Sequence, residues 1–454
     1  MKTIKLLFLV FVIHFFIFSN IFPQGNTDRD VNILKMVNNV SSKRIKQNIE
    51  KLVGFVTRHT LSRTDSDSIG IGAARRWVKK TFEQYAKNSN GRMEVYFDSF
   101  MLKPDGRRID RKVELKNVIA KLKGTDKNDN RIFIVSGHLD SRNSNSMDST
   151  GFAPGADDDA SGVAVVMELA NILSKSKFPS TILFVAFSGE EQGLYGSKHL
   201  SKKARKENWN ITAVFNNDMV GSNNTSGTNL ITNEKVRVFS EGVPAFETKL
   251  MAKRRKYLST ENDSKSRQLA RYIKEIGEKY VDQVEVQLIY RKDRFLRGGD
   301  HTSFNNEGFT AVRLCEIHEN YNHQHQDVRI ENGIEYGDLP KFVDFNYLAK
   351  IAQINLSALT NLALAPEAPA NVRIDVSKLT NFSTLLWNKS TNIRTKGYNI
   401  LIRETSSPTW QKKIFTKDST ITIPYSKDNF LFAVQTIDGK GHTSLPVIPV
   451  PSFR

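Results

Sequence analysis

The sequence places histidine and aspartate close together in one short stretch. His138 lies in Gly-His-Leu-Asp-Ser, and an aspartate triplet at 157–159 lies in Gly-Ala-Asp-Asp-Asp-Ala-Ser-Gly. Zinc binds histidine nitrogen and carboxylate oxygen, so this stretch suits a zinc site. Each part also has an ordinary structural explanation, because an aspartate in front of a helix commonly caps it. Taken alone, the stretch leaves both explanations open.

Three later segments add groups of the same kind. They contain the pair Glu190-Glu191, then Asp218, then a run with His323 and His325. One zinc ion takes three or four protein ligands, so the combined set suffices for two ions if one carboxylate bridges them. Two metal ions about 3.5–4 Å apart can together polarise a carbonyl and activate water. A free carboxylate beside that water can take its proton and pass it to a leaving amine.

Each of these segments follows an apolar run that is typical of a buried strand. The runs span residues 132–135, 181–187, 213–215 and 310–314. Helical patterns lie between or after them, at 163–173, 263–280 and 340–364. This alternation predicts an α/β fold with a mainly parallel, mixed sheet sandwiched by helices. Ligands bind at the carboxyl edge of such sheets, so the acidic and imidazole groups should meet there.

The region before the first of these strands is predicted to be helical and then extended. Ser41 or Ser42 can cap a helix, and a second helix is expected at 72–85. Two strands are expected at 93–101 and 118–122.

The pattern changes after a Pro- and Ala-rich stretch at 365–370. Short alternating runs follow at 372–376, 383–387, 398–403, 421–423 and 430–437. They predict a small all-β sandwich, and we place the boundary between residues 365 and 366. This part resembles a fibronectin type III domain in Leu386-Trp387, Gly397-Tyr398 and Phe430-Leu-Phe-Ala-Val434. A contact with a surface or glycan, a spacer role and assistance in export are the open alternatives for it.

The composition and charge of the chain limit the kinds of partner that we expect. The chain has 454 residues, 39% of them hydrophobic, and a formal net charge of +18. The basic residues are spread along the sequence, and no zinc ribbon or aromatic-basic RNA motif occurs, so we expect no nucleic-acid partner. The charge favours weak association with anionic surfaces or acidic polymers. The single cysteine, Cys315, excludes an intrachain disulfide.

The first 24 residues have the pattern of a secretory signal peptide. Lys2 and Lys5 precede an apolar run at 6–18 that only His14 interrupts. We therefore expect a secreted or periplasmic protein whose larger domain spans residues 25–365. No later run is long enough to cross a bilayer, so no stable membrane insertion is expected after cleavage. An uncleaved amino-terminal anchor is the alternative.

Residues 41–364 resemble the co-catalytic di-zinc exopeptidase family, which includes bacterial leucyl aminopeptidases, glutamate carboxypeptidases and glutaminyl cyclases. Five blocks occur in the family's order. They are Gly137-His-Leu-Asp-Ser141, Gly155-Ala-Asp-Asp-Asp-Ala-Ser-Gly162, Glu190-Glu-Gln-Gly-Leu-Tyr-Gly-Ser197, Asn217-Asp-Met219 and His323-x-x-x-Asp327.

The resemblance implies two zinc ions bridged by Asp158. His138 and Asp218 would complete one site, and Glu191 and His323 the other. In the family an aspartate follows the last histidine by four residues, which selects His323.

The resemblance also implies roles for the remaining groups. Glu190 would be the general base and acid, and Asp140 would orient the first histidine. Asp300 would line the pocket or support a ligand, or would only fix its loop. The family has Thr or Ser directly after the last histidine, whereas Gln324 stands here, so His325 is the alternative ligand.

The expected function is that of a secreted zinc aminopeptidase acting on peptides. A carboxypeptidase or dipeptidase on the same scaffold is the nearest rival. A glutaminyl cyclase-like acyltransferase and a non-catalytic receptor or adhesion protein are the further alternatives.

Overall fold

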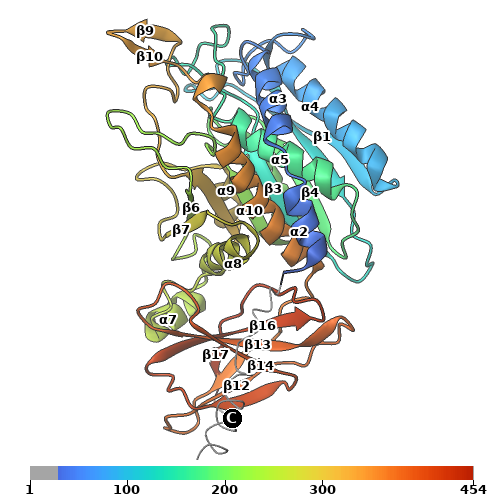
Figure 1. The fold of residues 1–454 in the computed structure, drawn as a ribbon, viewed down its shortest axis with the longest axis vertical. Helices are drawn as coiled ribbons and strands as arrows, with labels where there is room; N and C mark the ends of the chain where they lie inside the picture. The colour runs from blue at the N-terminus through green and yellow to red at the C-terminus, as the bar shows by residue number, and fades with distance from the viewer. Residues whose placement is uncertain (1–28, 453–454) are drawn as a thin grey trace, which may run out of the picture.

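The computed structural model describes residues 29–452. The predicted signal peptide at 1–24 lies outside these residues. A large mixed sheet with helices on both faces forms the first and larger part, and two small sheets form the C-terminal part (Figure 1). None of the helices within residues 29–452 combines the length and apolar character that a membrane span requires.

The large sheet has eight strands in the order β1-β2-β4-β3-β5-β8-β6-β7. The strands are β1 (Met93–Leu102), β2 (Val113–Leu122), β3 (Arg131–His138), β4 (Thr181–Phe187), β5 (Asn210–Asn217), β6 (Lys235–Ser240), β7 (Glu285–Ile289) and β8 (Ala311–Glu316). Neighbouring strands β4, β3, β5 and β8 are parallel. β1, β2 and β4 pair antiparallel, as do β8 and β6. The predicted α/β class with a mixed sheet is confirmed.

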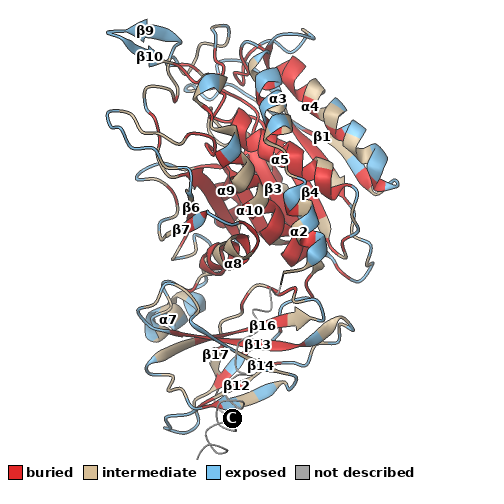
Figure 2. Cartoon of the chain, in the orientation of Figure 1, coloured by how far each residue is buried: buried red, intermediate tan, exposed pale blue. Residues whose placement is uncertain are grey.

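Helices cover both faces of this sheet. They are α2 (Val31–Asn38), α3 (Ser42–Val53), α4 (Gly70–Ala86), α5 (Ala160–Leu173), α6 (Tyr195–Lys206), α8 (Lys265–Tyr280), α9 (Asp300–Asn306) and α10 (Phe345–Leu364). A further helix, α7 (Lys249–Leu258), buries none of its residues and lies beside the C-terminal sheets (Figure 1). Phe133 and Val135 of β3 pack in one apolar core with α2, α3, α4, α5, α8 and α10. Ile134 faces the opposite way and packs with Leu200 of α6 and Phe304 of α9. This alternation follows from the two-residue period of a strand. Figure 2 shows the buried residues concentrated in the central strands and in α5 and α10.

Local capping explains where several helices begin. The Ser41 side chain accepts a hydrogen bond from Arg44 N, so α3 starts at Ser42, as predicted. The predicted helix at 340–364 starts later, because the Asp344 side chain accepts from Asn346 N and Tyr347 N and opens α10 at Phe345. Residues 340–342 form a separate short 3-10 turn.

The C-terminal part consists of two small sheets around one apolar core. One sheet has the order β15-β12-β11-β17 and the other β14-β13-β16. Their strands are β11 (Arg373–Asp375), β12 (Ser383–Leu386), β13 (Thr395–Glu404), β14 (Lys412–Thr416), β15 (Thr420–Ile423), β16 (Phe430–Asp438) and β17 (Val450–Ser452). Leu385, Trp387 and Tyr398 lie in the shared core. The predicted strands are confirmed, while the resemblance to fibronectin type III and the boundary at 365 stay predictions. A separate hairpin, β9 (Arg329–Glu331) and β10 (Ile334–Tyr336), lies far from this part (Figure 1).

Buried polar contacts join the two parts. Asp263, just before α8, accepts two hydrogen bonds of 2.8 Å from Arg403 of β13 and one of 3.0 Å from Arg271. The Tyr272 hydroxyl donates to the backbone oxygen of Thr443 at 2.8 Å. The small sheets therefore pack against α8 and are not joined to the larger part by the connecting segment alone.

Candidate metal centre

The predicted site residues meet at one edge of the large sheet. His138 is the last residue of β3, Glu190 and Glu191 follow β4, and Asp218 follows β5. Strands β4, β3 and β5 are parallel neighbours, so their carboxyl ends lie side by side. Asp158 enters from the loop between β3 and α5. This is the sheet edge at which the sequence predicted that the groups would meet.

Two groups of side chains could each hold a metal ion. His138, Asp158 and Asp218 form one group, and Asp158, Glu191 and His325 form the other, with ligand atoms within 4.8 Å of one another in each. His138 Nε2 lies 3.0 Å from Asp158 Oδ1 and 3.8 Å from Asp218 Oδ1. On the other side, His325 Nε2 lies 2.9 Å from Asp158 Oδ2 and 2.9 Å from Glu191 Oε1. Asp158 thus presents one carboxylate oxygen to each group, which is the arrangement of a bridging ligand.

The structure corrects the expectation that His323 is the last ligand. Its ring stacks on Phe342 with centroids 3.7 Å apart, and it belongs to neither group. Burial lowers the pKa of His323 to about 4, with Glu335 opposing the change. The alternative, His325, occupies the expected place. The backbone at His325 has a left-handed φ of 58°, which directs the two histidines to different surroundings.

The hydrogen bond of His138 leaves its Nε2 atom available to bind a metal ion. Its Nδ1 lies 3.0 Å from the backbone oxygen of Asp140. A carbonyl oxygen only accepts, so Nδ1 donates and the lone pair of the neutral ring lies on Nε2, towards the carboxylates.

Charge at the site also fits a cation. Burial opposes protonation of His138, but Glu190 and Asp159 together with the hydrogen bonds of Asp158 and Asp218 raise its pKa well above the usual range. His325 shows the same balance: burial lowers its pKa, and the carboxylates of Glu191 and Asp158 raise it to about 9. The carboxylates of both groups therefore favour positive charge at the Nε2 atoms. Nitrogen and oxygen donors in groups of three are the ligand set of zinc, so these residues fit that ion.

Asp140 acts differently from the prediction. Its carboxylate accepts hydrogen bonds from the backbone N–H groups of Gly189, Glu190 and Glu191 at 3.0, 3.2 and 3.1 Å. It also accepts from the Thr60 hydroxyl at 2.8 Å. Its nearest contact with His138 Nδ1 is 3.7 Å, and the backbone carbonyl orients that ring instead. The side chain of Asp140 therefore fixes the loop that carries the two glutamates.

Glu190 belongs to neither metal-ligand group, which leaves its carboxylate free for proton transfer. Burial raises its pKa well above the usual range, with His138 opposing and Asp218 and Asp300 adding to the rise. A carboxyl group with a raised pKa is suited to accept and return a proton near neutral pH.

Asp300 is the first residue of α9 and is buried. Neither carboxylate oxygen makes a hydrogen bond within the usual limits, although the Ser197 hydroxyl lies close enough to influence it. Burial raises its pKa to about 7, with the charge of His138 opposing and that of Asp218 adding to the rise. Asp300 is thus a buried carboxyl group beside the centre.

Two arginines that the sequence analysis did not identify contact the candidate ligands. Arg313 Nη2 donates to Asp218 Oδ1 at 2.8 Å. Arg142 Nη2 lies 2.7 Å from His325 Nδ1, and its Nε donates to Glu191 Oε2 at 3.2 Å. Arg313 could have been identified from the sequence, because it is a charged residue inside the predicted apolar strand at 310–314. Arg142 directly follows the first motif block, and nothing in the sequence around it indicated a contact with the ligands.

Two aspartates hold the backbone around the bridging carboxylate. Asp338 accepts from Asp157 N and Asp158 N, each at 2.8 Å. Asp159 accepts from His138 N at 2.8 Å and from Gly162 N at 2.9 Å, so it also caps α5. Within the aspartate triplet, Asp159 therefore caps a helix, and Asp158 belongs to the candidate metal site.

Comparisons with known proteins agree with this site. Residues 117–344 match peptidase family M28. A probable zinc metalloprotease of Leptosphaeria maculans is 42% identical over 420 residues, which cover 92% of this chain and 97% of that protein. Another, of Pyricularia oryzae, is 42% identical over 93% of this chain and 85% of its own length. The solved structure of the LapA aminopeptidase of Legionella pneumophila has a TM-score of 0.51 at 21% identity, over 73% of this chain and 72% of that one. At that identity the last match supports the fold.

Proposed function

Because the chain belongs to peptidase family M28, and so is a metallopeptidase, we propose that it is a zinc-dependent exopeptidase, specifically an aminopeptidase that removes amino-terminal residues from peptides. One observation carries the proposal: Asp158 gives an oxygen to each of two ligand groups, and Glu190 stands beside them without belonging to either. That is the set of side chains that metal-assisted hydrolysis of an amide requires.

In this proposal two zinc ions are held by side chains that the sequence already offers. His138, Asp158 and Asp218 hold one, and Asp158, Glu191 and His325 hold the other. When bound, zinc supplies Lewis acidity, which polarises a carbonyl oxygen and lowers the pKa of water.

The proton route belongs to the protein. Glu190 accepts a proton from the attacking water and later gives it to the departing amine, which restores the carboxylate. Asp140 keeps Glu190 in place through the hydrogen bond to its backbone N–H. A base held by its backbone in this way loses little freedom when substrate arrives.

The preference for a free amine rests on charge. Asp300 and Glu190 add two buried or partly buried carboxyl groups that neither metal-ligand group uses. In their ionised form these two groups attract an ammonium group and repel a free carboxylate. A carboxypeptidase or dipeptidase needs a cation for the substrate's carboxylate, whereas Arg142 and Arg313 are already engaged with candidate ligands.

The two remaining alternatives lack a comparable observation. A glutaminyl cyclase-like acyltransferase uses one zinc ion and so needs only one ligand group, and a non-catalytic receptor needs neither the two ligand groups nor a free Glu190. We also propose export to the periplasm or the outside, on the sequence pattern of the first 24 residues alone. A contact of the C-terminal sheets with a surface or glycan is proposed on the same kind of evidence.

Three matched peptides test the choice of substrate end. One has both ends free, one has a blocked amine and one has a blocked carboxylate, and each is incubated with and without a chelator. An aminopeptidase fails only on the peptide with the blocked amine, and the chelator abolishes all cleavage. Failure only on the blocked carboxylate would assign a carboxypeptidase, and no cleavage of any peptide by zinc-loaded protein would contradict the proposal.

A further inference from the structure

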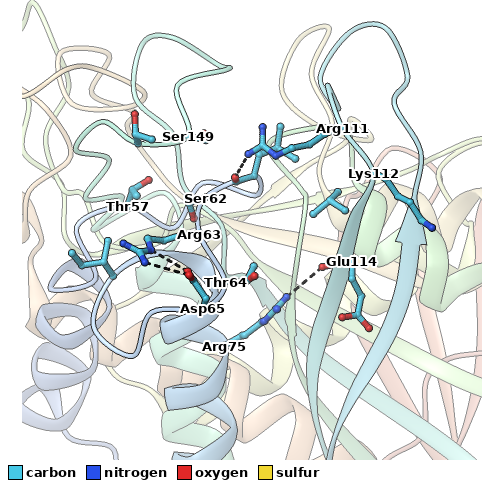
Figure 3. Close-up of a pocket in the computed structure, with 14 residues that line it drawn as sticks. Thr57, Ser62, Arg63, Thr64, Asp65, Arg75, Arg111, Lys112, Glu114 and Ser149 are labelled. Carbon is cyan, nitrogen blue, oxygen red and sulfur yellow. Dashed lines mark hydrogen bonds and ion pairs between the residues drawn. The ribbon is translucent and has the colours of Figure 1, made fainter.

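A cavity lies apart from the candidate metal centre, between the start of α4 and the start of β2 (Figure 3). Its volume is about 630 Å³, and no member of the two ligand groups lines it. The loop at 61–65 forms one wall, residues 111–114 form the facing wall, and Arg75 of α4 forms the base. This cavity has no part in the mechanism described above.

Basic side chains outnumber acidic ones around this cavity. The basic residues are Arg63, Arg75, Arg111 and Lys112, and the acidic ones are Asp65 and Glu114. Arg63 is neutralised by Asp65, since its Nε lies 3.0 Å from Oδ1. Arg111 pairs with Asp110 at 2.9 Å. Glu114 pairs with Lys116 at 3.0 Å. The excess positive charge therefore falls on Arg75 and Lys112.

Arg75 is a buried cation without a carboxylate partner. It is 8% exposed, and its one polar contact within the described residues is a 3.4 Å hydrogen bond to the backbone oxygen of Glu114. Among residues 29–452 no carboxylate forms an ion pair with it. Burial lowers its pKa, with Glu114 opposing, yet arginine keeps its proton in proteins. Buried charges in proteins are normally paired with an opposite charge. The Arg75 guanidinium has no such partner, so the position suits an anionic ligand.

The walls of the cavity adjoin the loop that carries Glu190. Thr60, next to Leu61 of the cavity wall, donates to the carboxylate of Asp140 at 2.8 Å. On the facing wall, Leu115 follows Glu114 and packs so closely on Gly189 that a Cβ there would lie 2.8 Å from Leu115 Cδ1. A peptide extends by about 3.3 Å per residue, so several residues can link the metal centre with a neighbouring cavity.

We propose that this cavity binds a carboxylate of the peptide substrate, several residues beyond the bond that is cleaved. The proposal rests on the proposed function, because it takes the ligand to be a peptide. A cavity of about 630 Å³ has room for a side chain together with its backbone. Arg75 supplies the planar pair of donors that matches a carboxylate. The carboxylate comes either from an Asp or Glu side chain or from the free carboxyl end of a short peptide.

The test measures binding without turnover. Fluorescently labelled peptides of four to eight residues, with Asp or Asn at one position from the third onward, are titrated into zinc-loaded Glu190→Gln protein, and anisotropy is read. We expect the best Asp peptide to bind roughly tenfold more tightly than its Asn counterpart, since hydrogen bonds to charged groups are worth that much or more. Amidation of the carboxyl end of the Asn peptides shows whether a terminal carboxylate can replace the side chain.

Variants of the cavity complete the test. Arg75→Met should remove the preference for Asp, Arg75→Lys should keep part of it, and Lys112→Met, on the exposed rim, should weaken it less. Lys80→Met, an exposed residue of the same helix that does not line the cavity, should leave the preference unchanged. Thermal unfolding establishes that each variant is folded. Should Arg75→Met fail to fold, the effects of Arg75→Lys and Lys112→Met decide, and an unchanged preference in both overturns the proposal.

The outcomes separate this proposal from the proposed function. Equal affinity for Asp, Asn and amidated peptides, or an Asp preference that survives in folded Arg75→Met protein, overturns the carboxylate site. Acetate binding that depends on Arg75, without any preference among peptides, also overturns it. An Arg75-dependent preference in protein whose wild-type form cleaves no peptide supports the site and contradicts the aminopeptidase. Cleavage of peptides without any preference for Asp supports the aminopeptidase and contradicts the carboxylate site.

Discussion

His325 Nε2 lies 2.9 Å from Asp158 Oδ2, whereas the ring of His323 stacks on Phe342. Two histidines separated by one residue thus have different surroundings, and only one of them faces the shared carboxylate. Of the two histidines, His325 belongs to the second group of possible metal ligands and His323 does not.

Replacing each histidine in turn should separate their roles. His325→Ala should lower the zinc content from two ions per chain to about one and reduce activity roughly a hundredfold or more, since changes merely around a ligand already cost 10–100-fold. His323→Ala should keep both ions and activity within a few-fold, and lose about 1 kcal/mol of stability with the aromatic contact. Zinc analysis of dialysed protein and initial rates measure both. The reverse pattern would restore His323 as the ligand.

Asp140 offers a second test, because its carboxylate holds three consecutive N–H groups of the glutamate loop. An amide in Asp140→Asn can accept through only one of its two end atoms, so the loop should lose its fixed position. We expect kcat to fall about 10–100-fold while KM changes less, by analogy with the supporting partners of metal ligands. Thr60→Val removes only the hydroxyl donor to the same carboxylate and should have an effect several times smaller. Equal effects of the two variants would contradict this role.

The contact between the two parts of the chain should depend on one buried carboxylate. Asp263→Ala leaves Arg271 and Arg403 buried without their partner, which should lower the free energy of unfolding by about 3–5 kcal/mol. The exposed pair Lys413–Glu275 joins the same two parts at 2.8 Å and serves as the control. Glu275→Ala should cost less than about 1 kcal/mol. Denaturant unfolding gives both values, and similar losses would contradict the importance assigned to Asp263.

Glu241 should make stability depend on pH. Burial raises its pKa from 4.5 to about 7, with the Ala245 N–H and Lys292 opposing. The folded state then binds the proton more tightly than the unfolded chain, so stability is highest below pH 4.5 and falls as pH rises towards 7. Glu241→Gln removes this loss, and its stability relative to the wild type should increase from pH 5 to pH 8 by at most about 3 kcal/mol. Chemical denaturation at both pH values measures it. A pH-independent difference would contradict the raised pKa.

The sequence predicted the features that depend on local pattern. Alternation and apolar runs located β4 at residues 181–187, and the motif blocks placed His138, Glu191 and Asp218 after strands that proved to be parallel neighbours. Asp158 was also expected at a strand end, but it lies in the loop between β3 and α5. Such predictions succeed because the carboxyl ends of parallel strands share one edge, whatever lies in the loops between them.

What the sequence missed depends on contacts between distant segments. The choice between His323 and His325 follows from the left-handed turn at His325 and from Phe342. The hydrogen bonds of Asp140 to the glutamate loop join residues about fifty positions apart, and no spacing rule reveals them. The short helices α6 and α9 were not predicted, because their apolar positions are too few to establish a period.

The central claim is that Glu190 moves protons at a centre whose metal ions other residues hold. Zinc content and turnover should be measured together in the wild-type protein and in Glu190→Gln. We expect two zinc ions per chain in both, and a turnover in the variant that is lower by about 10²–10⁴-fold, the usual contribution of a general base. A variant that holds its zinc and still cleaves peptides within a few-fold of the wild-type rate would show that Glu190 does not transfer the proton.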